Sequence, residues 1–302
     1  MIRLTLRFAI AMVLMAIPAV IHESRAADIF YVTMSDNTVR KFDTDGNDLG
    51  IFASEGLNDP RGLAFDASGN LYVANYGSAI LAKFNSQGAY LAAESISLGQ
   101  STSVGVAIDS AGAIYVSNEN SARVRKFDAA GTLLATSPTG NTPNGLAFDG
   151  SGFLRVANRT GNTITKFDTN LNAVAGTIST NLNRPRGLAV DASGNIYAAN
   201  NFTDSISKFT SSGTFLDQYL GVITPTGIAF DSQGYLYAAA NREIFKLNPA
   251  GQTVARWSTG RLSTSYIAFP TTTVPEPGTM ALGAIAVAAA LLAKRRSRKR
   301  PV

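Results

Sequence analysis

Residues 60–75 read PRGLAFDASGNLYVAN, and residues 185–200 read PRGLAVDASGNIYAAN. The two stretches begin 125 residues apart and differ at only three of their sixteen positions. Looser copies of the same phrase occupy residues 103–118, 143–158 and 225–241. Repetition with a period near 40 residues is typical of repeat architectures, so this stretch indicates a fold built from repeated units.

Each copy predicts four short β-strands. The apolar run at residues 62–65 indicates a strand buried on both faces, and residues 66–70 indicate a tight turn with an Asp and a Gly. Residues 71–75 and 80–84 predict the second and third strands, and a fourth follows near Tyr90. Four strands in about 40 residues are typical of one β-propeller blade.

The number of blades follows from the incomplete units at the two ends of the repeat. Residues 29–49 contain the second, third and fourth strands but no first strand, and residues 265–269 contain only a first strand. Five whole units and these complementary fragments predict six blades, with the last strand completing the first sheet. Such closure hides the sheet edges. An open solenoid is the alternative, but it needs capping repeats rather than complementary halves.

The repeated pattern P-x-G-[LI]-A-[FV]-D, followed by G-x-[LI]-Y-[VA]-A-N, resembles the NHL repeat. It is also similar to the wider set of six-bladed propellers that includes gluconolactonase-like proteins and streptogramin lyases. The resemblance covers residues 29–269 and implies an all-β, six-bladed propeller. Because this fold hosts binding proteins and enzymes alike, the resemblance implies no single function.

Residues 1–26 are expected to form a secretory signal peptide. They begin with Arg3 and Arg7, continue through an apolar run at residues 8–21, and end on small residues at Ala26. The alternative is an uncleaved membrane anchor, for which the apolar run is short.

Residues 274–302 have a three-part organisation, and the propeller domain is therefore expected to span residues 27–273. Pro275, Glu276 and Pro277 precede a short apolar stretch that leads into a cluster of Lys and Arg. This order resembles the PEP-CTERM sorting signal of exported proteins of Gram-negative bacteria. The resemblance implies an exosortase-type processing enzyme as a partner and transient inner-membrane anchoring through a short hydrophobic transmembrane helix. It also implies a final location at the cell surface or outside the cell.

Removing both terminal segments changes the charge balance of the chain. The 26 basic residues fall to 17 and the 21 acidic residues to 19, so the net charge of +5 becomes −2. The basic isoelectric point therefore belongs to the targeting segments and does not indicate nucleic acid as a partner. The chain contains no Cys, so the exported domain has no disulfides.

Few residues are available for catalysis. The only histidine, His22, lies in the expected signal peptide, and without Cys this excludes Ser-His-Asp and Cys-His arrangements from the mature protein. The gluconolactonase resemblance implies a divalent ion at the channel mouth. Its candidate ligands here are Glu119, Asn158, Asn200 and Asp204, although no motif fixes that set.

Residues 43–48 read DTDGND and resemble a calcium-binding loop. They lack the later bidentate Glu of such loops, and they occupy the place of a hairpin turn in the other units. A turn is therefore favoured over a calcium site, and no cofactor is expected.

One end of the propeller gathers the candidate ligand-binding residues. The loops that follow the second strand and the loops that precede the first strand emerge there together. The candidates are Arg61, Asn75, Asn118, Glu119, Asn158, Arg159, Arg186, Asn200 and Arg242.

Two interpretations remain open for each residue type. The recurrent Asn either ends its strand through local hydrogen bonds or contributes to a ring of amides for a hydroxyl-rich ligand. The arginines either only solvate the surface or form a cationic patch for an anionic polymer. The resulting hypothesis is an exported, non-enzymatic module that binds polysaccharide or another exported protein. The alternative is a metal-dependent hydrolase of the gluconolactonase kind.

Overall fold

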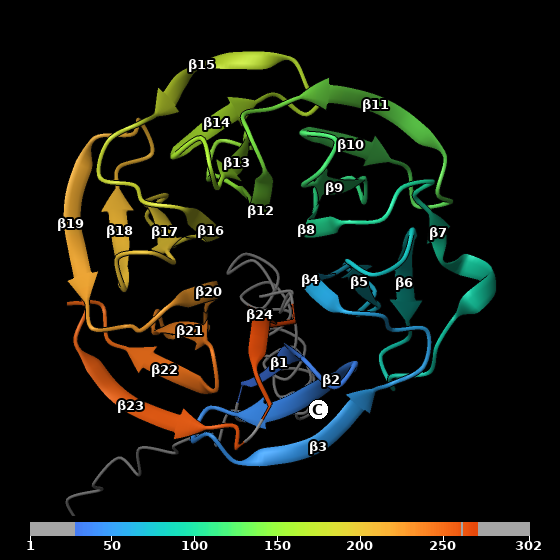
Figure 1. The fold of residues 1–302 in the computed structure, drawn as a ribbon, viewed down its shortest axis with the longest axis horizontal. Coiled ribbons are helices and arrows are strands. Elements are labelled where there is room, and N and C mark those ends of the chain that lie inside the picture. The colour runs from blue at the N-terminus through green and yellow to red at the C-terminus, as the bar shows by residue number, and fades with distance from the viewer. Residues whose placement is uncertain (1–27, 261, 271–302) are drawn as a thin grey trace, which may run out of the picture.

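The computed structural model describes residues 28–260 and 262–270, which form six four-stranded sheets arranged in a ring (Figure 1). The predicted all-β, six-bladed propeller is confirmed. The expected signal peptide and sorting tail, including the predicted terminal helix, lie outside the described residues. Among the described residues, no helix has the length and hydrophobicity needed to cross a membrane.

Each sheet runs from an inner strand at the axis to an outer strand at the rim. The first blade contains β24 (Thr264–Ala268), β1 (Ile29–Met34), β2 (Thr38–Asp43) and β3 (Asp48–Ala53). The second contains β4 (Pro60–Phe65), β5 (Leu71–Asn75), β6 (Ile80–Phe84) and β7 (Ile96–Ser97), with the short 3₁₀ helix η1 (Ala92–Glu94) before β7. The third contains β8 (Ser103–Ile108), β9 (Ile114–Asn118), β10 (Arg123–Phe127) and β11 (Leu133–Pro138).

The remaining blades repeat this order along the chain. The fourth contains β12 (Pro143–Phe148), β13 (Leu154–Asn158), β14 (Thr163–Phe167) and β15 (Ala173–Ile178). The fifth contains β16 (Pro185–Val190), β17 (Ile196–Asn200), β18 (Ser205–Phe209) and β19 (Phe215–Leu220). The sixth contains β20 (Pro225–Phe230), β21 (Leu236–Ala240), β22 (Glu243–Leu247) and β23 (Thr253–Ser258).

The ring closes through the strand nearest the C-terminus. Strand β24 pairs antiparallel with β1, with Ile267 opposite Val32 and Ala268 opposite Tyr31. The side chains of Val32 and Ile267 are buried, and Phe269 packs against Phe30 with ring centroids 5.6 Å apart. The predicted completion of the first sheet by the last strand is therefore confirmed, and the solenoid alternative is excluded.

Glycine at the third position of the inner strands permits close packing around the axis. Five inner strands have Gly there, namely Gly62, Gly105, Gly145, Gly187 and Gly227. A Cβ at any of them would lie 2.2 to 2.5 Å from a backbone atom of the next inner strand. The sixth inner strand, β24, has Tyr266 at this position.

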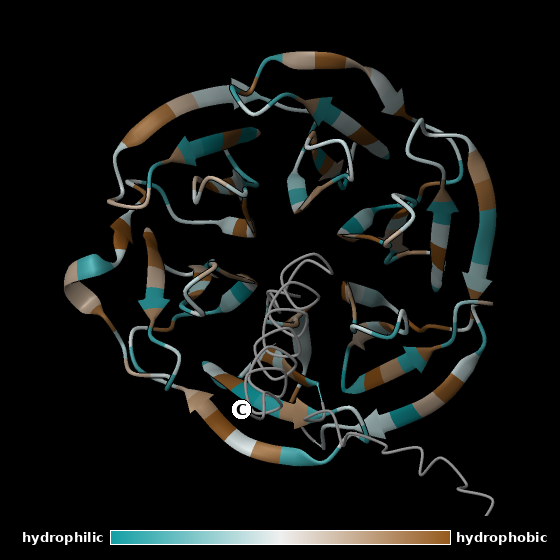
Figure 2. Cartoon of the chain, turned by 180° about the vertical axis from the view of Figure 1, so that it is seen from behind, coloured by the Kyte–Doolittle hydropathy of each residue, from teal (hydrophilic) through white to brown (hydrophobic). Residues whose placement is uncertain are grey.

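The hydrophobic core lies between neighbouring blades rather than in one central cluster. The cluster between the third and fourth blades, for example, combines Tyr115 and Val124 with Leu154 and Phe167. Toward the rim, the outer strands carry both hydrophobic and hydrophilic residues (Figure 2). Burial in the inner layers therefore holds each blade against its neighbours and fixes the loops at the two ends of the ring.

Candidate functional site

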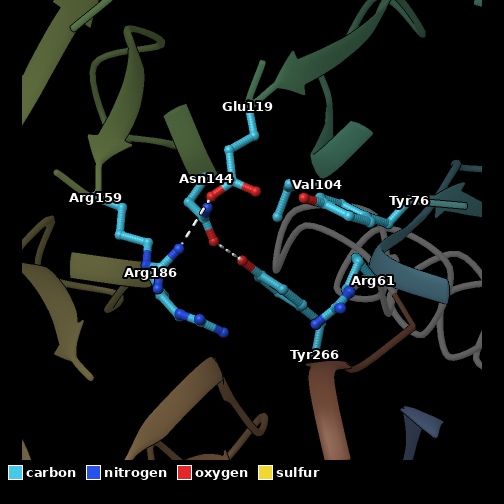
Figure 3. Close-up of a pocket in the computed structure, with 8 residues that line it drawn as sticks. All are labelled: Arg61, Tyr76, Val104, Glu119, Asn144, Arg159, Arg186 and Tyr266. Atoms are coloured by element: carbon cyan, nitrogen blue, oxygen red, sulfur yellow. Dashed lines mark hydrogen bonds and ion pairs between the residues drawn. The ribbon is translucent and has the colours of Figure 1, made fainter. Parts of the chain in front are cut away.

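A cavity of about 230 Å³ lies at one end of the propeller axis (Figure 3). We call it the arginine cavity. It is lined by Arg61, Tyr76, Val104, Glu119, Asn144, Arg159, Arg186 and Tyr266.

Two repeat positions supply nearly all of this lining. The second residue of an inner strand contributes Arg61, Val104, Asn144 and Arg186. The residue directly after a second strand contributes Tyr76, Glu119 and Arg159. Because each blade presents these two positions at the same end of the ring, residues from the second to the fifth blade converge on one cavity.

Arg61 is held by two neighbours. Its Nη2 donates to Oδ2 of Asp59 at 2.9 Å, and its guanidinium carbon lies 5.1 Å from the ring centroid of Tyr76. Stacking of this kind fixes the plane of the guanidinium group. Its Nε is buried and has no hydrogen-bond partner.

Arg159 and Glu119 form the ion pair within the cavity, with Nη1 and Oε1 3.2 Å apart. The Glu119 side chain is only 12% exposed. Burial and the Glu119 carboxylate raise the pKa of the Tyr76 hydroxyl, because both disfavour a phenolate. The Nε of Arg159 is also buried without a partner.

Arg186 is the least compensated charge in the cavity. Burial lowers the pKa of its guanidinium group, and the positive charges of Arg159 and Arg61 lower it further. Within residues 28–260 and 262–270, no ion pair includes Arg186, and its Nε is buried and unpartnered. Three guanidinium groups therefore face one carboxylate in this cavity.

The buried Nε groups of Arg61, Arg159 and Arg186 account for three of the five side-chain atoms that are buried without a partner in the described part of the chain. A buried donor without an acceptor costs about 1–3 kcal/mol, so three such groups around one cavity are unusual. Guanidinium groups bind carboxylates and phosphates through paired, charge-assisted hydrogen bonds. The cavity is thus suited to an anionic group.

Tyr266 forms the floor of the arginine cavity. Its hydroxyl donates a 2.6 Å hydrogen bond to Oδ1 of Asn144, 122 positions away in the sequence (Figure 3). Tyr266 also lines a second, smaller space along the axis, whose other lining residues are Gly, Leu, Val and Ile of the inner strands. The tyrosine ring thus lies between the arginine cavity at the mouth and this smaller space within the ring.

The structure brings four of the nine predicted ligand-face residues into the arginine cavity, namely Arg61, Glu119, Arg159 and Arg186. Arg242 is exposed at the same end of the ring but does not line the cavity. Pro275, Glu276 and Pro277 lie outside the described residues.

The four predicted asparagines are buried at the ends of the second strands, below the loops that form the mouth of the ring. They are Asn75, Asn118, Asn158 and Asn200. Asn75, for example, donates from Nδ2 to the carbonyl of Gly56 at 2.8 Å and accepts at Oδ1 from the backbone N–H of Asn58 at 2.9 Å. These bonds tie the loop that precedes an inner strand to the end of the second strand. They join segments 17 and 19 residues apart and do not close a local turn.

Tyr266 was not among the residues predicted for this end of the ring, whereas Asn144 lies in one of the loops expected to enter it. The inner strand of the first blade reads TSYIA where the other copies read P-x-G-[LIV]-A or S-V-G-V-A. Replacement of an otherwise repeated Gly by Tyr is the signal that would have identified Tyr266. Nothing local to Asn144 indicates its partner, because the hydrogen bond crosses the axis.

The candidate metal ligands do not form a site that fits a divalent ion. Glu119 pairs with Arg159, and Asp204 accepts from the N–H of Thr224. Asn158 and Asn200 are buried, and each donates from Nδ2 to a hydroxyl of the third strand of its blade. No group of three or more His, Cys, Asp or Glu residues gathers within residues 28–260 and 262–270.

The resemblance of residues 43–48 to a calcium loop is explained by a hairpin turn between β2 and β3. Oδ1 of Asp43 accepts from the N–H groups of Asp45 and Asn47 within that turn. The same Asp-centred bonding recurs in the turns of the other blades, for instance at Asp128 and Asp168.

Comparison with known families identifies the C-terminal segment. Residues 273–297 match the PEP-CTERM protein-sorting motif. The chain carries an export signal. PEP-CTERM motifs are recognised by exosortase in Gram-negative bacteria, so this propeller is exported, processed at its C-terminal end, and located at the cell surface or outside the cell. No curated protein matches the chain.

Solved structures of other propellers resemble this PEP-CTERM propeller in fold. A chain of a nidogen/laminin complex matches with a TM-score of 0.71 and 15% identity, covering 82% of this chain and 99% of that one. Streptogramin B lyase matches with a TM-score of 0.61 and 16% identity, covering 78% and 80%. A protein of unknown function from Bacteroides caccae matches with a TM-score of 0.65 and 11% identity, covering 82% and 100%. At these identities the likeness concerns the fold alone.

Proposed function

We propose that this exported propeller is a non-enzymatic binding protein of the cell surface or extracellular matrix, and that its arginine cavity holds an anionic group of an acidic polysaccharide. The observation that carries the proposal is the convergence of three guanidinium groups, from Arg61, Arg159 and Arg186, on one cavity whose described lining contains a single carboxylate, that of Glu119. An anionic group of the ligand pairs with these guanidinium groups and offsets the excess positive charge.

The chemistry of the cavity favours binding over catalysis. Its single carboxylate, Glu119, is engaged by Arg159 and is therefore a poor general base. Burial raises the pKa of the Tyr266 hydroxyl, and burial together with Glu119 raises that of Tyr76. Both phenols stay protonated at neutral pH, so neither acts as a general base, and the Tyr266 hydroxyl already donates to Asn144.

Binding of uronic-acid oligosaccharides to the purified protein tests this function. We expect acidic oligosaccharides to bind and their neutral counterparts to bind far more weakly, with affinity that falls as salt rises. Arg186→Gln should weaken binding at least tenfold, because it removes the charge that has no ion-pair partner among the described residues. Isothermal titration calorimetry at two salt concentrations measures both effects.

The matched control is Arg123→Gln, which removes an exposed arginine from the start of β10 without touching the cavity. It should bind like the wild type. Equal affinity for neutral and acidic oligosaccharides, or full affinity in Arg186→Gln, would contradict the proposed function.

A further inference from the structure

A second cavity, of about 310 Å³, adjoins the arginine cavity at the mouth. Both are lined by Arg61 and Arg186. The second cavity is rich in hydroxyl and amide groups, and we call it the hydroxyl cavity. The groups that matter here belong to Thr224, Thr226, Ser263, Ser265, Asn201 and Asn241.

The blade order explains why there are two cavities. Arg61 belongs to the second blade and Arg186 to the fifth. These two blades are three apart in a ring of six, so their inner strands β4 and β16 face each other across the axis (Figure 1). On one side of this arginine pair, the second position of the inner strands is Val104 and Asn144. On the other side, the same position is Thr226 and Ser265.

The two sides therefore differ in chemistry although they share a boundary. The arginine cavity adds Arg159, Glu119 and two tyrosines to the shared pair. The hydroxyl cavity adds one carboxylate, Asp59, which already accepts a hydrogen bond from Arg61. Within the described part of the chain, its lining includes no aliphatic or aromatic side chain.

Such a lining fits a neutral sugar ring better than a protein side chain. Hydroxyl and amide groups both donate and accept hydrogen bonds, as sugar hydroxyls do. Protein partners, in contrast, place aromatic or aliphatic anchors in pockets that exclude water. The glycan is therefore the ligand class that the hydroxyl cavity favours.

We propose that the mouth has two subsites, so that an acidic sugar in the arginine cavity is followed by a neutral sugar in the hydroxyl cavity. The inference rests on the proposed function and adds the preferred sequence of the glycan. Arg61 and Arg186 lie between the subsites and hold the acidic group, while Thr226 and Ser265 contact the neutral ring.

Three defined ligands test the arrangement: a free uronic acid, a disaccharide of that uronic acid with a neutral hexose, and a disaccharide of two uronic acids. We expect the mixed disaccharide to bind about tenfold more tightly than the free acid, through added hydrogen bonds. That gain should persist at high salt, whereas binding of the acid itself weakens. The diuronate should gain less, because Arg61 and Arg186 already pair with the first carboxylate and Asp59 repels the second.

The variant Thr226→Val/Ser265→Ala should abolish the tenfold gain and leave the affinity for the free acid unchanged. Ser193→Ala, in an exposed turn at the other end of the ring, is its control and should keep the gain. Unchanged unfolding temperatures establish that both variants fold.

The possible failures are distinguishable. If the free uronic acid does not bind, the proposed function and the two-subsite arrangement both fail. If the acid binds but the neutral hexose adds nothing, only the two-subsite arrangement fails. Equal loss of affinity for both ligands in Thr226→Val/Ser265→Ala, or tighter binding of an acidic peptide than of the mixed disaccharide, also overturns the arrangement.

Discussion

Single residues at the axis decide how closely the blades approach. A Cβ on Gly145 would lie 2.3 Å from the carbonyl oxygen of Arg186, and 2.9 Å from Cα of Gly187. Neither atom belongs to a flexible side chain, so the strands themselves would have to move. A single residue also forms the floor of the arginine cavity. Tyr266 replaces the repeated Gly, and its hydroxyl reaches across the axis to Asn144.

We expect Gly145→Ala to destabilise the protein by about 1–3 kcal/mol, the usual cost of overpacking a close-packed interior. The control is Gly150→Ala, because a Cβ there meets only Cα of Gly194 at 3.7 Å and Ala occupies the same turn position in two other blades, at Ala67 and Ala192. This control should be neutral or stabilising by about 0.4–1 kcal/mol. Urea unfolding measures both, and equal stability of the two variants would contradict the packing argument.

Within a single blade, the second strand shows how the repeat accommodates a charged residue. Tyr115 and Tyr197 each donate from the hydroxyl to the turn Asp of their own blade, Asp109 and Asp191, at 3.0 Å. In the fourth blade the corresponding residue is Arg155. Its Nε donates to Oδ2 of the turn residue Asp149 at 2.9 Å, and both side chains are almost fully buried. The turn Asp is thus retained in the fourth blade, but the group that donates a hydrogen bond to it is a guanidinium instead of a tyrosine hydroxyl.

We expect Arg155→Met to destabilise the protein by about 3–5 kcal/mol, because it leaves the buried Asp149 carboxylate without its charged partner. Arg155→Tyr should cost much less, since a tyrosine hydroxyl satisfies the equivalent carboxylate in two other blades. Chemical denaturation of both variants checks this order. A tyrosine variant as unstable as the methionine variant would contradict it.

Ring closure and repetition both contribute to the stability of the whole propeller. Strand β24 covers the edge of β1 and so joins the last unit to the first. Repetition also places aspartates in the turns of several blades, and hydrogen bonds within these turns lower the pKa of Asp43, Asp128, Asp168 and Asp191. For Asp191, burial acts in the opposite direction but is outweighed by the bonds from Asn195 and Tyr197.

We expect acid to destabilise the whole ring. A carboxyl whose pKa is lower in the folded state stabilises the protein above its unfolded pKa, about 3.9 for Asp, and this stabilisation is lost as pH falls through the folded value. Stability should therefore decline below about pH 4. Asp191→Asn should be less stable than the wild type at pH 7, and the difference should shrink as the pH approaches 2. Urea midpoints across this range test the sign, and a constant difference would contradict it.

Much of the fold could be predicted from the sequence because its rules are local. The period of the phrase at residues 60–75, the Gly and Asp of its turns, and the complementary fragments at the two ends together determine six blades and their closure. The sequence also places Arg61 and Arg186 at the same repeat position. These features depend on residues that are neighbours along the chain or in one blade.

The contacts of the residues at the mouth depend on the closed ring. The closed ring places Arg61 and Arg186 across the axis from each other, hydrogen-bonds Tyr266 to Asn144, and engages the amide of Asn75 with backbone groups of the preceding loop. The physical reason is that charge compensation and hydrogen-bond satisfaction at the axis depend on partners from different blades. Those partners meet only after the ring has closed.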